Sequence, residues 1–170
     1  MESKNLKSKC VRFDVLPKSF NEFEELFNKR SQDPHYVVAL TVAALCLWPE
    51  DKNAAVKILN LLKGPEDLSP YDIQFISERL ADREYLPYSY FKGSNPENKY
   101  TADRLYTIEI NVVPSSNAEK GYIKFYLQSS GADSMRPITV REKPSTGQWF
   151  LWQQNLLSQI RIPTSEDVWK

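Results

Sequence analysis

The chain has few of the residues from which catalytic and metal sites are built. Its 170 residues include one histidine and two cysteines, and no glycine-rich phosphate loop occurs. A Ser–His or Cys–His pair would have to use His35, which stands beside Pro34 at a helix start and is expected to be an ordinary surface residue. A metal site would have to consist mainly of carboxylates. The sequence therefore predicts no catalytic residue, metal or cofactor, and it favours a protein that is not an enzyme.

An excess of one charge is also absent, because Lys plus Arg and Asp plus Glu both number 22. No overall field would then hold nucleic acid or an anionic membrane. The longest apolar run, residues 36–48, has 13 members, whereas a membrane-spanning helix needs roughly 20. The polar start, residues 1–5, shows no apolar signal region. We expect a cytoplasmic protein without nucleic acid or membrane partners, in which Cys10 and Cys46 remain thiols.

Length and composition fit one folded domain. A chain of 170 residues falls within the usual range for a domain, and 41% of its residues are hydrophobic and 12% aromatic. We divide it into a polar leader at residues 1–18 and one domain at 19–170. Within that domain we expect a helical part at 19–83, an ordered loop at 84–104, and a sheet with a tail at 105–170. The oligomeric state stays open.

Four helices are expected in the helical part. The run at residues 36–48 is apolar around nearly the whole circumference of a helix, so it must be covered on several sides and should be the central helix. Helix starts are marked by capping residues followed by proline or glutamate, and the third helix ends at a glycine followed by proline. These signals are Ser19 to Glu22, Asp33-Pro34, Gly64-Pro65 and Ser69-Pro70.

The second half alternates apolar and polar residues with period two, which is typical of half-buried strands. Four antiparallel strands joined as a meander follow from this pattern, at 106–112, 123–127, 138–143 and 148–153. Helices first and strands afterwards, with one polar sheet face, indicate an α+β fold in which the helices cover the other face. This order is similar to the cone-shaped NTF2-like or cystatin-like architecture, an analogy that assigns no function.

The polar sheet face is the candidate binding surface. Alternation places large rings and charged side chains on it, where a solvated sheet more often shows Thr, Lys and Glu. One of Trp149 and Trp152 belongs to it as well, because the two residues differ in parity, but the alternation does not say which. The alternative is a solvated face with a few amphipathic rings. The remaining members of this surface are Tyr122, Lys124, Tyr126 and Arg141.

Three more charged residues are candidates. Asp133 and Arg136 stand in the hairpin between the second and third strands. Asp133 either bonds the backbone of its own turn or joins the binding site together with Arg136. Glu109 could serve as an acid–base group, but it shares the polar face with Lys124 and Arg141, so cross-strand charge pairing explains it more simply.

The last residues of the chain also alternate, with Ile160, Ile162 and Trp169 as the apolar members. Pro163 allows a sharp turn, so we expect this tail to pack back on the domain with its aromatic end over apolar surface. Such packing would make residues 160–170 part of the fold.

Three motifs carry a resemblance to a known family. They are Ser-Ser-Gly-Ala-Asp-Ser-x-Arg-Pro-Ile at 129–138, Gln-Trp-Phe-Leu-Trp at 148–152 and Ile-Arg-Ile-Pro-x-Ser-Glu-Asp-x-Trp at 160–169. With the segments at 61–65 and 68–72, they resemble a family of uncharacterised bacterial proteins described as a domain of unknown function. The likeness extends over residues 34–169 and implies a bacterial origin, but no activity, cofactor or site residue. Val168 departs from the family pattern, which usually has proline at that position.

Two classes of function remain. The first is a non-enzymatic protein-binding module, for instance an accessory, adaptor or immunity-type protein that presents the sheet face to a protein partner. The second is a small-molecule binder or enzyme with an NTF2-like pocket lined by Tyr and Trp, in which Asp133 or Glu109 is the acid–base group. A filled interior with an exposed face favours the first class, and an apolar cavity with convergent polar groups favours the second.

Overall fold

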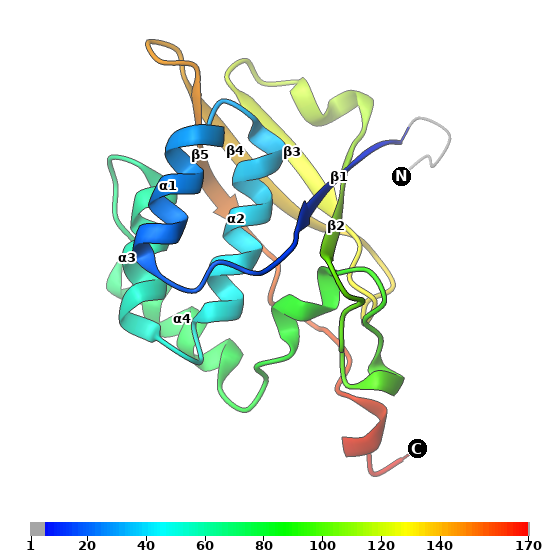
Figure 1. Ribbon diagram of the computed structural model, residues 1–170. Helices are drawn as coiled ribbons and strands as arrows, with labels where there is room; N and C mark the ends of the chain where they lie inside the picture. The colour runs from blue at the N-terminus through cyan, green and yellow to red at the C-terminus, as the bar shows by residue number, and fades with distance from the viewer. Residues whose placement is uncertain (1–5, 170) are drawn as a thin grey trace.

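Residues 6–169 are described by the computed structural model, and in this range five β-strands form one layer and four α-helices the other (Figure 1). The α+β class predicted from the sequence is confirmed. The strands are antiparallel and lie in the sheet in chain order, so each strand pairs with the next. They are β1 (Lys7–Phe13), β2 (Tyr106–Val112), β3 (Tyr122–Leu127), β4 (Arg136–Lys143) and β5 (Gln148–Gln154).

Three of the four helices begin at the capping signals in the sequence, and the remaining helix is capped by Asp51. At the first, the Ser19 hydroxyl accepts a hydrogen bond from the Glu22 N–H (3.2 Å), but the Glu22 carboxylate accepts from the Lys18 N–H (2.7 Å) instead of closing the box at Ser19. A complete capping box forms between Ser69 and Asp72. The helices are α1 (Phe20–Arg30), α2 (Pro34–Leu47), α3 (Lys52–Lys63) and α4 (Pro70–Leu80).

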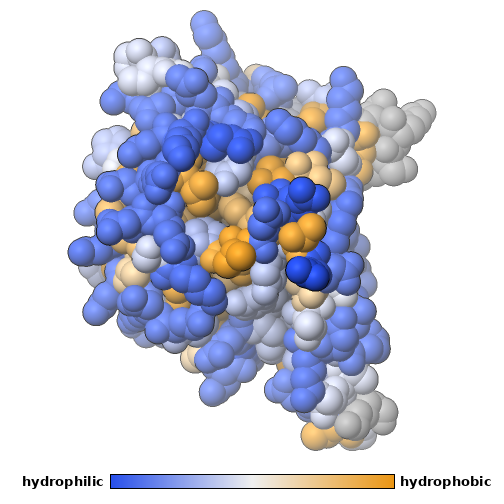
Figure 2. Space-filling view, in the orientation of Figure 1, coloured by the Kyte–Doolittle hydropathy of each residue, from blue (hydrophilic) through white to orange (hydrophobic). Residues whose placement is uncertain are grey.

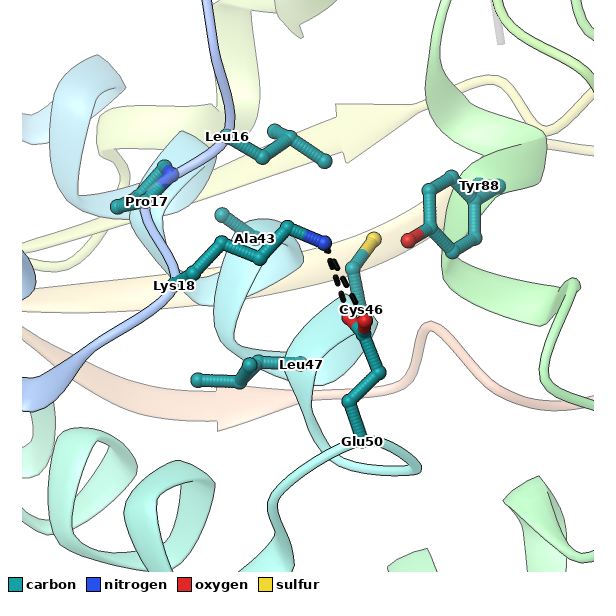
Figure 3. Close-up of a pocket in the computed structure, with 8 residues that line it drawn as sticks. All are labelled: Leu16, Pro17, Lys18, Ala43, Cys46, Leu47, Glu50 and Tyr88. Atoms are coloured by element: carbon teal, nitrogen blue, oxygen red, sulfur yellow. Dashed lines mark hydrogen bonds and ion pairs between the residues drawn. The ribbon is translucent and has the colours of Figure 1, made fainter.

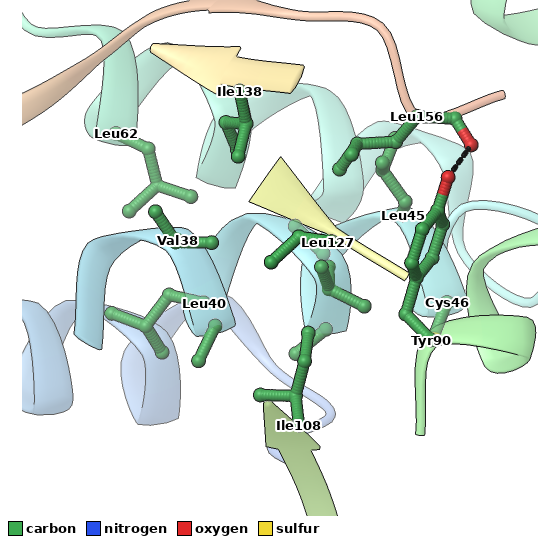
Figure 4. Packing of buried hydrophobic residues seen from close by; sticks show 14 of the residues in the cluster. Val38, Leu40, Leu45, Cys46, Leu62, Tyr90, Ile108, Leu127, Ile138 and Leu156 are labelled. Atoms are coloured by element: carbon green, nitrogen blue, oxygen red, sulfur yellow. Dashed lines mark hydrogen bonds between the residues drawn. The ribbon is translucent and has the colours of Figure 1, made fainter. Parts of the chain in front are cut away.

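Helix α2 is the buried centre of the molecule, as its sequence predicts. Every residue from Tyr36 to Leu47 is buried, and the hydroxyl of Thr41 is satisfied by donating to the Val37 carbonyl (2.9 Å). The helix lies against the inner face of the sheet and packs beside α1 and α3. Apolar residues of α2 and of the strands meet there (Figure 4). The sheet's inner face is therefore covered by packed side chains.

The prediction of four strands is wrong, because β1 adds a fifth in the segment expected to be part of a polar leader. This strand pairs with β2 along its whole length, from Lys7 opposite Val112 to Phe13 opposite Tyr106. It is an edge strand, and only Val11 and Phe13 are buried in it. Two buried residues give too short an alternation to be recognised in the sequence. Residues 1–5 of the expected leader lie outside the described residues.

The loop between α4 and β2 packs on the domain through aromatic side chains. Its 3₁₀ helix at Leu86–Tyr90 buries Leu86 and Tyr90, and Phe91 beside it is buried too. The Tyr90 hydroxyl donates to the carbonyl of Leu156, and that of Tyr100 donates to the carbonyl of Arg161. Aromatic side chains of this loop thus hold the segment that follows β5.

The expectation for the tail is correct at its start and wrong at its end. Ile160 is buried, and the Arg161 N–H donates to the Gly131 carbonyl (2.9 Å). Ile162 is partly exposed, and Trp169 is 91% exposed. The short helical turn at Thr164–Glu166 directs the chain away from the apolar surface that Trp169 was expected to cover.

The helical side of the molecule presents mostly hydrophilic residues, with small and separate apolar patches (Figure 2). Among the described residues, no helix is long and apolar enough to cross a bilayer. Both cysteines are free, with Cys10 exposed and Cys46 buried.

Candidate functional site

The outer face of the sheet carries the side chains that the sequence singled out. Cross-strand register places Tyr122 opposite Arg141, Lys124 opposite Thr139, and Tyr126 opposite Pro137. Because paired residues point to the same side of an antiparallel sheet, these positions share the face away from α2. Buried residues such as Phe125 and Val140 alternate with them and point inward.

Three of these residues form a compact cluster, which we call the arginine clamp: Tyr122, Arg141 and Trp152. The guanidinium carbon of Arg141 lies 5.5 Å from the centre of the Tyr122 ring and 5.1 Å from that of Trp152. The two rings meet edge to face, with centres 5.5 Å apart. Distances below about 6 Å allow a cation–π interaction between the guanidinium and each ring. The three side chains therefore contact one another and form one cluster.

Trp152 is the outward-facing tryptophan, with 44% of its surface exposed. The Trp149 side chain instead packs against the core, and the backbone N–H of Trp149 donates to the Ser31 carbonyl (2.7 Å) next to the end of α1. This answers the question that alternation left open.

A β-bulge positions Trp152. Leu151 pairs with Val140 and Gln153 pairs with Thr139, so Trp152 is the extra residue of β5 at a register shift. Bulges bend a strand and re-aim the side chain at the extra position, and they are frequent beside functional sites. Here the bulge accompanies the close approach of the Trp152 ring to its neighbours in the clamp.

A groove with a volume of about 820 Å³ runs beside the clamp. Its walls are parts of β4, of the edge strand β5 and of the turn that follows α3. At Gly64 in that turn φ is +83°, and a β-carbon would lie 2.8 Å from the ring of Phe150. Both facts require glycine, which lets the turn approach β5 closely. The side chains that line the groove include Lys63, Glu66, Arg141, Lys143, Phe150 and Trp152.

In the described part of the chain, no acidic group forms an ion pair with the guanidinium of Arg141. Within residues 6–169, its side chain makes no hydrogen bond and no ion pair, and its two ring neighbours carry no formal charge. A guanidinium offers five N–H donors in a planar fork that matches a carboxylate or a phosphate. The groove lining also holds three basic side chains against two acidic ones, Glu66 and Glu142. Its chemistry is therefore suited to an anionic group that accompanies an apolar one.

The other predicted members of the face are separate from the clamp. The Lys124 ammonium lies 5.9 Å from the centre of the Tyr126 ring, so these two residues form their own pair. Glu109 is exposed on β2, and no ion pair joins it to Lys124 or Arg141 in the described part of the chain.

Asp133 and Arg136 lie at the tail instead. The Arg136 guanidinium donates to the carbonyls of Ser158 (3.1 Å), Gln159 (3.2 Å) and Ser134 (2.8 Å), which fastens the chain after β5 to the hairpin. Asp133 is 95% exposed and pairs with Arg161 (3.0 Å). These contacts give both residues a structural role in holding the tail.

The single histidine is half-buried, which differs from the expected surface position. Its ring centre lies 4.8 Å from that of Phe125, and its Nδ1 lies 3.4 Å from the Asp33 carboxylate. Burial lowers the pKa of His35, and the negative charge of Asp33 opposes that change. No nucleophilic side chain is hydrogen-bonded to it among the described residues, so it does not form a catalytic pair.

Cys46 lies at the bottom of a second, much tighter hollow, under the ion pair of Lys18 and Glu50 (3.0 Å) and close to Tyr88 (Figure 3). This hollow leaves no room for a water molecule. Burial raises the pKa of the Cys46 thiol well above its usual value, and burial likewise raises the pKa of Tyr88. A buried, protonated thiol is not a nucleophile. In the described residues no group of His, Cys, Asp and Glu could hold a metal ion.

The sequence analysis missed one half of the site. The turn at Lys63–Glu66 contributes a wall of the groove, but Gly64-Pro65 carried only the signal of a helix end. Nothing in a local pattern shows that this turn and β5, more than eighty residues apart in the chain, lie side by side.

The structure thus defines a two-layer α+β protein with an exposed aromatic and basic groove. Its chain belongs to the family described as a domain of unknown function (DUF6935), whose model matches residues 15–164. No curated protein and no solved structure matches this chain. The family resemblance stated from the motifs is confirmed as membership, and the function has to be inferred from the site.

Proposed function

We propose that the protein is a non-enzymatic protein-binding module, of the accessory, adaptor or immunity type, whose working surface is the arginine clamp with the adjoining groove. The observation that carries this proposal is the unpaired guanidinium of Arg141, which lies beside two rings that contact each other, at 5.1 and 5.5 Å from their centres. Tryptophan, tyrosine and arginine are the residues most enriched in binding hot spots. Ring contacts fix the guanidinium in advance, which lowers the entropy lost on binding.

The shape of the groove supports a protein partner. It is bounded by an edge strand, β5, and by a short turn, so it is open along the side of the sheet. A neighbouring strand or loop of a partner can lie along such an edge, with its side chains entering the groove. Basic and acidic groups surround an apolar centre formed by Phe150, Leu151 and Trp152, which is the usual layout of an interface.

The alternative is a small-molecule pocket protein of the NTF2-like kind. An NTF2-like cone would hold its ligand between the sheet and the helices, where α2 and the strands instead fill the space with fully buried side chains. A groove of about 820 Å³ along the edge of the sheet is nevertheless within the size range of ligand sites. It makes small-molecule binding the second candidate. Asp133 and Glu109 give this candidate little support as acid–base groups, since both are exposed and lie outside the groove lining.

We further propose that the protein is bacterial and that it is located in the cytoplasm. Bacterial origin follows the family resemblance, and two free thiols agree with a reducing compartment.

Site-specific photo-crosslinking in the native cell tests the protein-binding function. A photoreactive phenylalanine analogue replaces Trp152 in one variant and Tyr71 in a control variant, because Tyr71 is an aromatic residue on α4 with 75% of its surface exposed. We expect a discrete adduct with another polypeptide at position 152 and none of that size at position 71. Adducts of equal yield at both positions, or at neither, would contradict the proposal.

A further inference from the structure

The segment Asp167–Trp169 presents two large apolar side chains that the fold does not use. Val168 is 87% exposed and Trp169 is 91% exposed, the two highest values among the large hydrophobic residues that are described. The Trp169 N–H donates to the Asp167 carboxylate (2.8 Å), so the segment has a local turn of its own. Apolar surface appears at this lower end of the molecule in Figure 2. Exposed rings on a short projecting segment are a common form of binding anchor.

Acidic residues accompany these apolar ones. Glu166 and Asp167 precede Val168 and Trp169, which gives the order acid, acid, valine, tryptophan. This order matches the chemistry of the groove, which offers Lys63, Lys143 and the unpaired Arg141 beside the rings of Phe150 and Trp152. A carboxylate can accept hydrogen bonds from the free guanidinium of Arg141, while an indole ring can stack on the rings of Phe150 and Trp152.

The tail and the groove of one molecule face different directions. Figure 1 shows the C-terminal segment at the lower end of the molecule and the β4–β5 hairpin at the opposite end. The preceding residues are fastened in place, because Tyr100 and Gly131 hydrogen-bond the backbone of Arg161 and Ile160 is buried. The segment can therefore fill the groove of a second copy, but not that of its own chain.

We infer that the protein self-associates by inserting the segment Glu166–Trp169 of one copy into the groove beside Arg141 of another. This inference rests on the proposed function and names a second copy of the chain as the partner. The contact joins two different surfaces, so a reciprocal exchange between two copies gives a two-fold symmetric dimer, and head-to-tail repetition gives a ring or a filament. The indole of Trp169 supplies the anchor, and the carboxylates of Glu166 and Asp167 supply the charge that the clamp lacks.

Sedimentation velocity on the full chain tests this inference. The average mass of the unmodified protein should rise with concentration. Trp169→Ala removes the anchor and Arg141→Ala removes its receptor, and each should weaken association by at least about tenfold, the effect of losing one hot-spot side chain. Tyr71→Ala is the matched control, because it removes an exposed ring elsewhere on the surface and should leave association unchanged.

Mixing the two defective variants gives the decisive result. Arg141→Ala keeps an intact segment and Trp169→Ala keeps an intact groove, so the two variants should associate with each other more tightly than either associates with itself. Failure of the mixture to associate, or a Trp169→Ala protein that associates like the unmodified one, would overturn the inference. If the chain stays monomeric while position 152 still crosslinks to a different protein, the inference fails and the proposed function stands. If crosslinking at position 152 is absent as well, both fail.

Discussion

The guanidinium carbon of Arg141 lies 5.1 Å from the centre of the Trp152 ring, and that tryptophan is the extra residue of a β-bulge. The bulge explains the short distance, because a bulge changes the direction of a side chain while one pairing of the strand becomes irregular. The Tyr122 ring contacts that of Trp152 and lies 5.5 Å from the same guanidinium, and neither ring neutralises its charge. This arrangement separates the clamp from an ordinary solvated sheet face.

Central packing gives the first prediction. Leu40→Ala on α2 should lower the free energy of unfolding by about 2–5 kcal/mol, since the leucine is fully buried and its removal leaves a cavity. Val15→Ala serves as the control, because Val15 is highly exposed and should change stability by about 0.5 kcal/mol or less. Urea unfolding of both variants checks this. Equal midpoints for the two would show that α2 is not the centre of the core.

The tail gives the second prediction. Arg136→Ala should destabilise the protein by about 1–3 kcal/mol, since it removes hydrogen bonds to the carbonyls of Ser158 and Gln159 and leaves those groups without their partner. Asp133→Ala should have a much smaller effect, of about 0–1 kcal/mol, because its ion pair is exposed. The comparison is made by thermal unfolding. The account of the tail is wrong if Asp133→Ala proves the more harmful change.

Glycine geometry at the groove gives the third prediction. Gly64→Ala and Gly121→Ala impose similar backbone strain, because φ is +83° at Gly64 and +85° at Gly121. Only Gly64 also faces a ring, that of Phe150, whereas a β-carbon at Gly121 meets nothing within 4 Å. Gly64→Ala should therefore cost about 1–3 kcal/mol more in unfolding free energy than Gly121→Ala. Equal losses in chemical denaturation would mean that the turn does not rest on β5.

Tyrosine burial gives a prediction about alkaline pH. Burial raises the pKa of Tyr88 and Tyr90, and it raises the pKa of Tyr100 to about 12. In the unfolded chain these hydroxyls lose their protons near pH 10. The folded state then binds more protons than the unfolded state above that pH, so stability falls as the pH rises from about 10 towards 12 and is unaffected by these groups below that window. The urea midpoint should therefore be lower when it is measured at about pH 11 than when it is measured at about pH 9.

Absorbance at the tyrosinate band provides the control for that experiment. Ionisation of the buried tyrosines should coincide with unfolding and not precede it. A midpoint that stays constant across this range, with tyrosinate forming in the folded protein, would contradict the burial of these hydroxyls.

The sequence predicts most of this fold but only half of the site. Capping residues at Ser19, Asp33 and Ser69 mark three helix starts, and alternation finds β2 to β5, because these signals are local. Strand β1 was missed since it buries only Val11 and Phe13 and takes its hydrogen bonds from a strand almost a hundred residues away. This strand is defined by its pairing with β2, which a local sequence pattern does not show.

The same division applies to the site. Alternation places Tyr122 and Arg141 on one face, and in the structure they lie opposite each other on β3 and β4. It does not choose between Trp149 and Trp152, because the two differ in parity and alternation alone does not say which parity of β5 faces outward. The role of Arg136 also escapes the sequence, since its acceptors are backbone carbonyls whose place depends on the path of the chain after β5.

The most direct test of the central claim compares stability and partner capture in one variant. Arg141→Ala should keep its melting temperature close to that of the unmodified protein, because an exposed residue changes stability by about 0.5 kcal/mol or less. Its capture of the polypeptide that crosslinks at position 152 should weaken by about 2 kcal/mol or more, as for a hot spot. Arg104→Ala, an exposed arginine in the loop before β2, should change neither quantity. An Arg141→Ala protein that captures its partner as well as Arg104→Ala does would contradict the claim that the arginine clamp is a binding site.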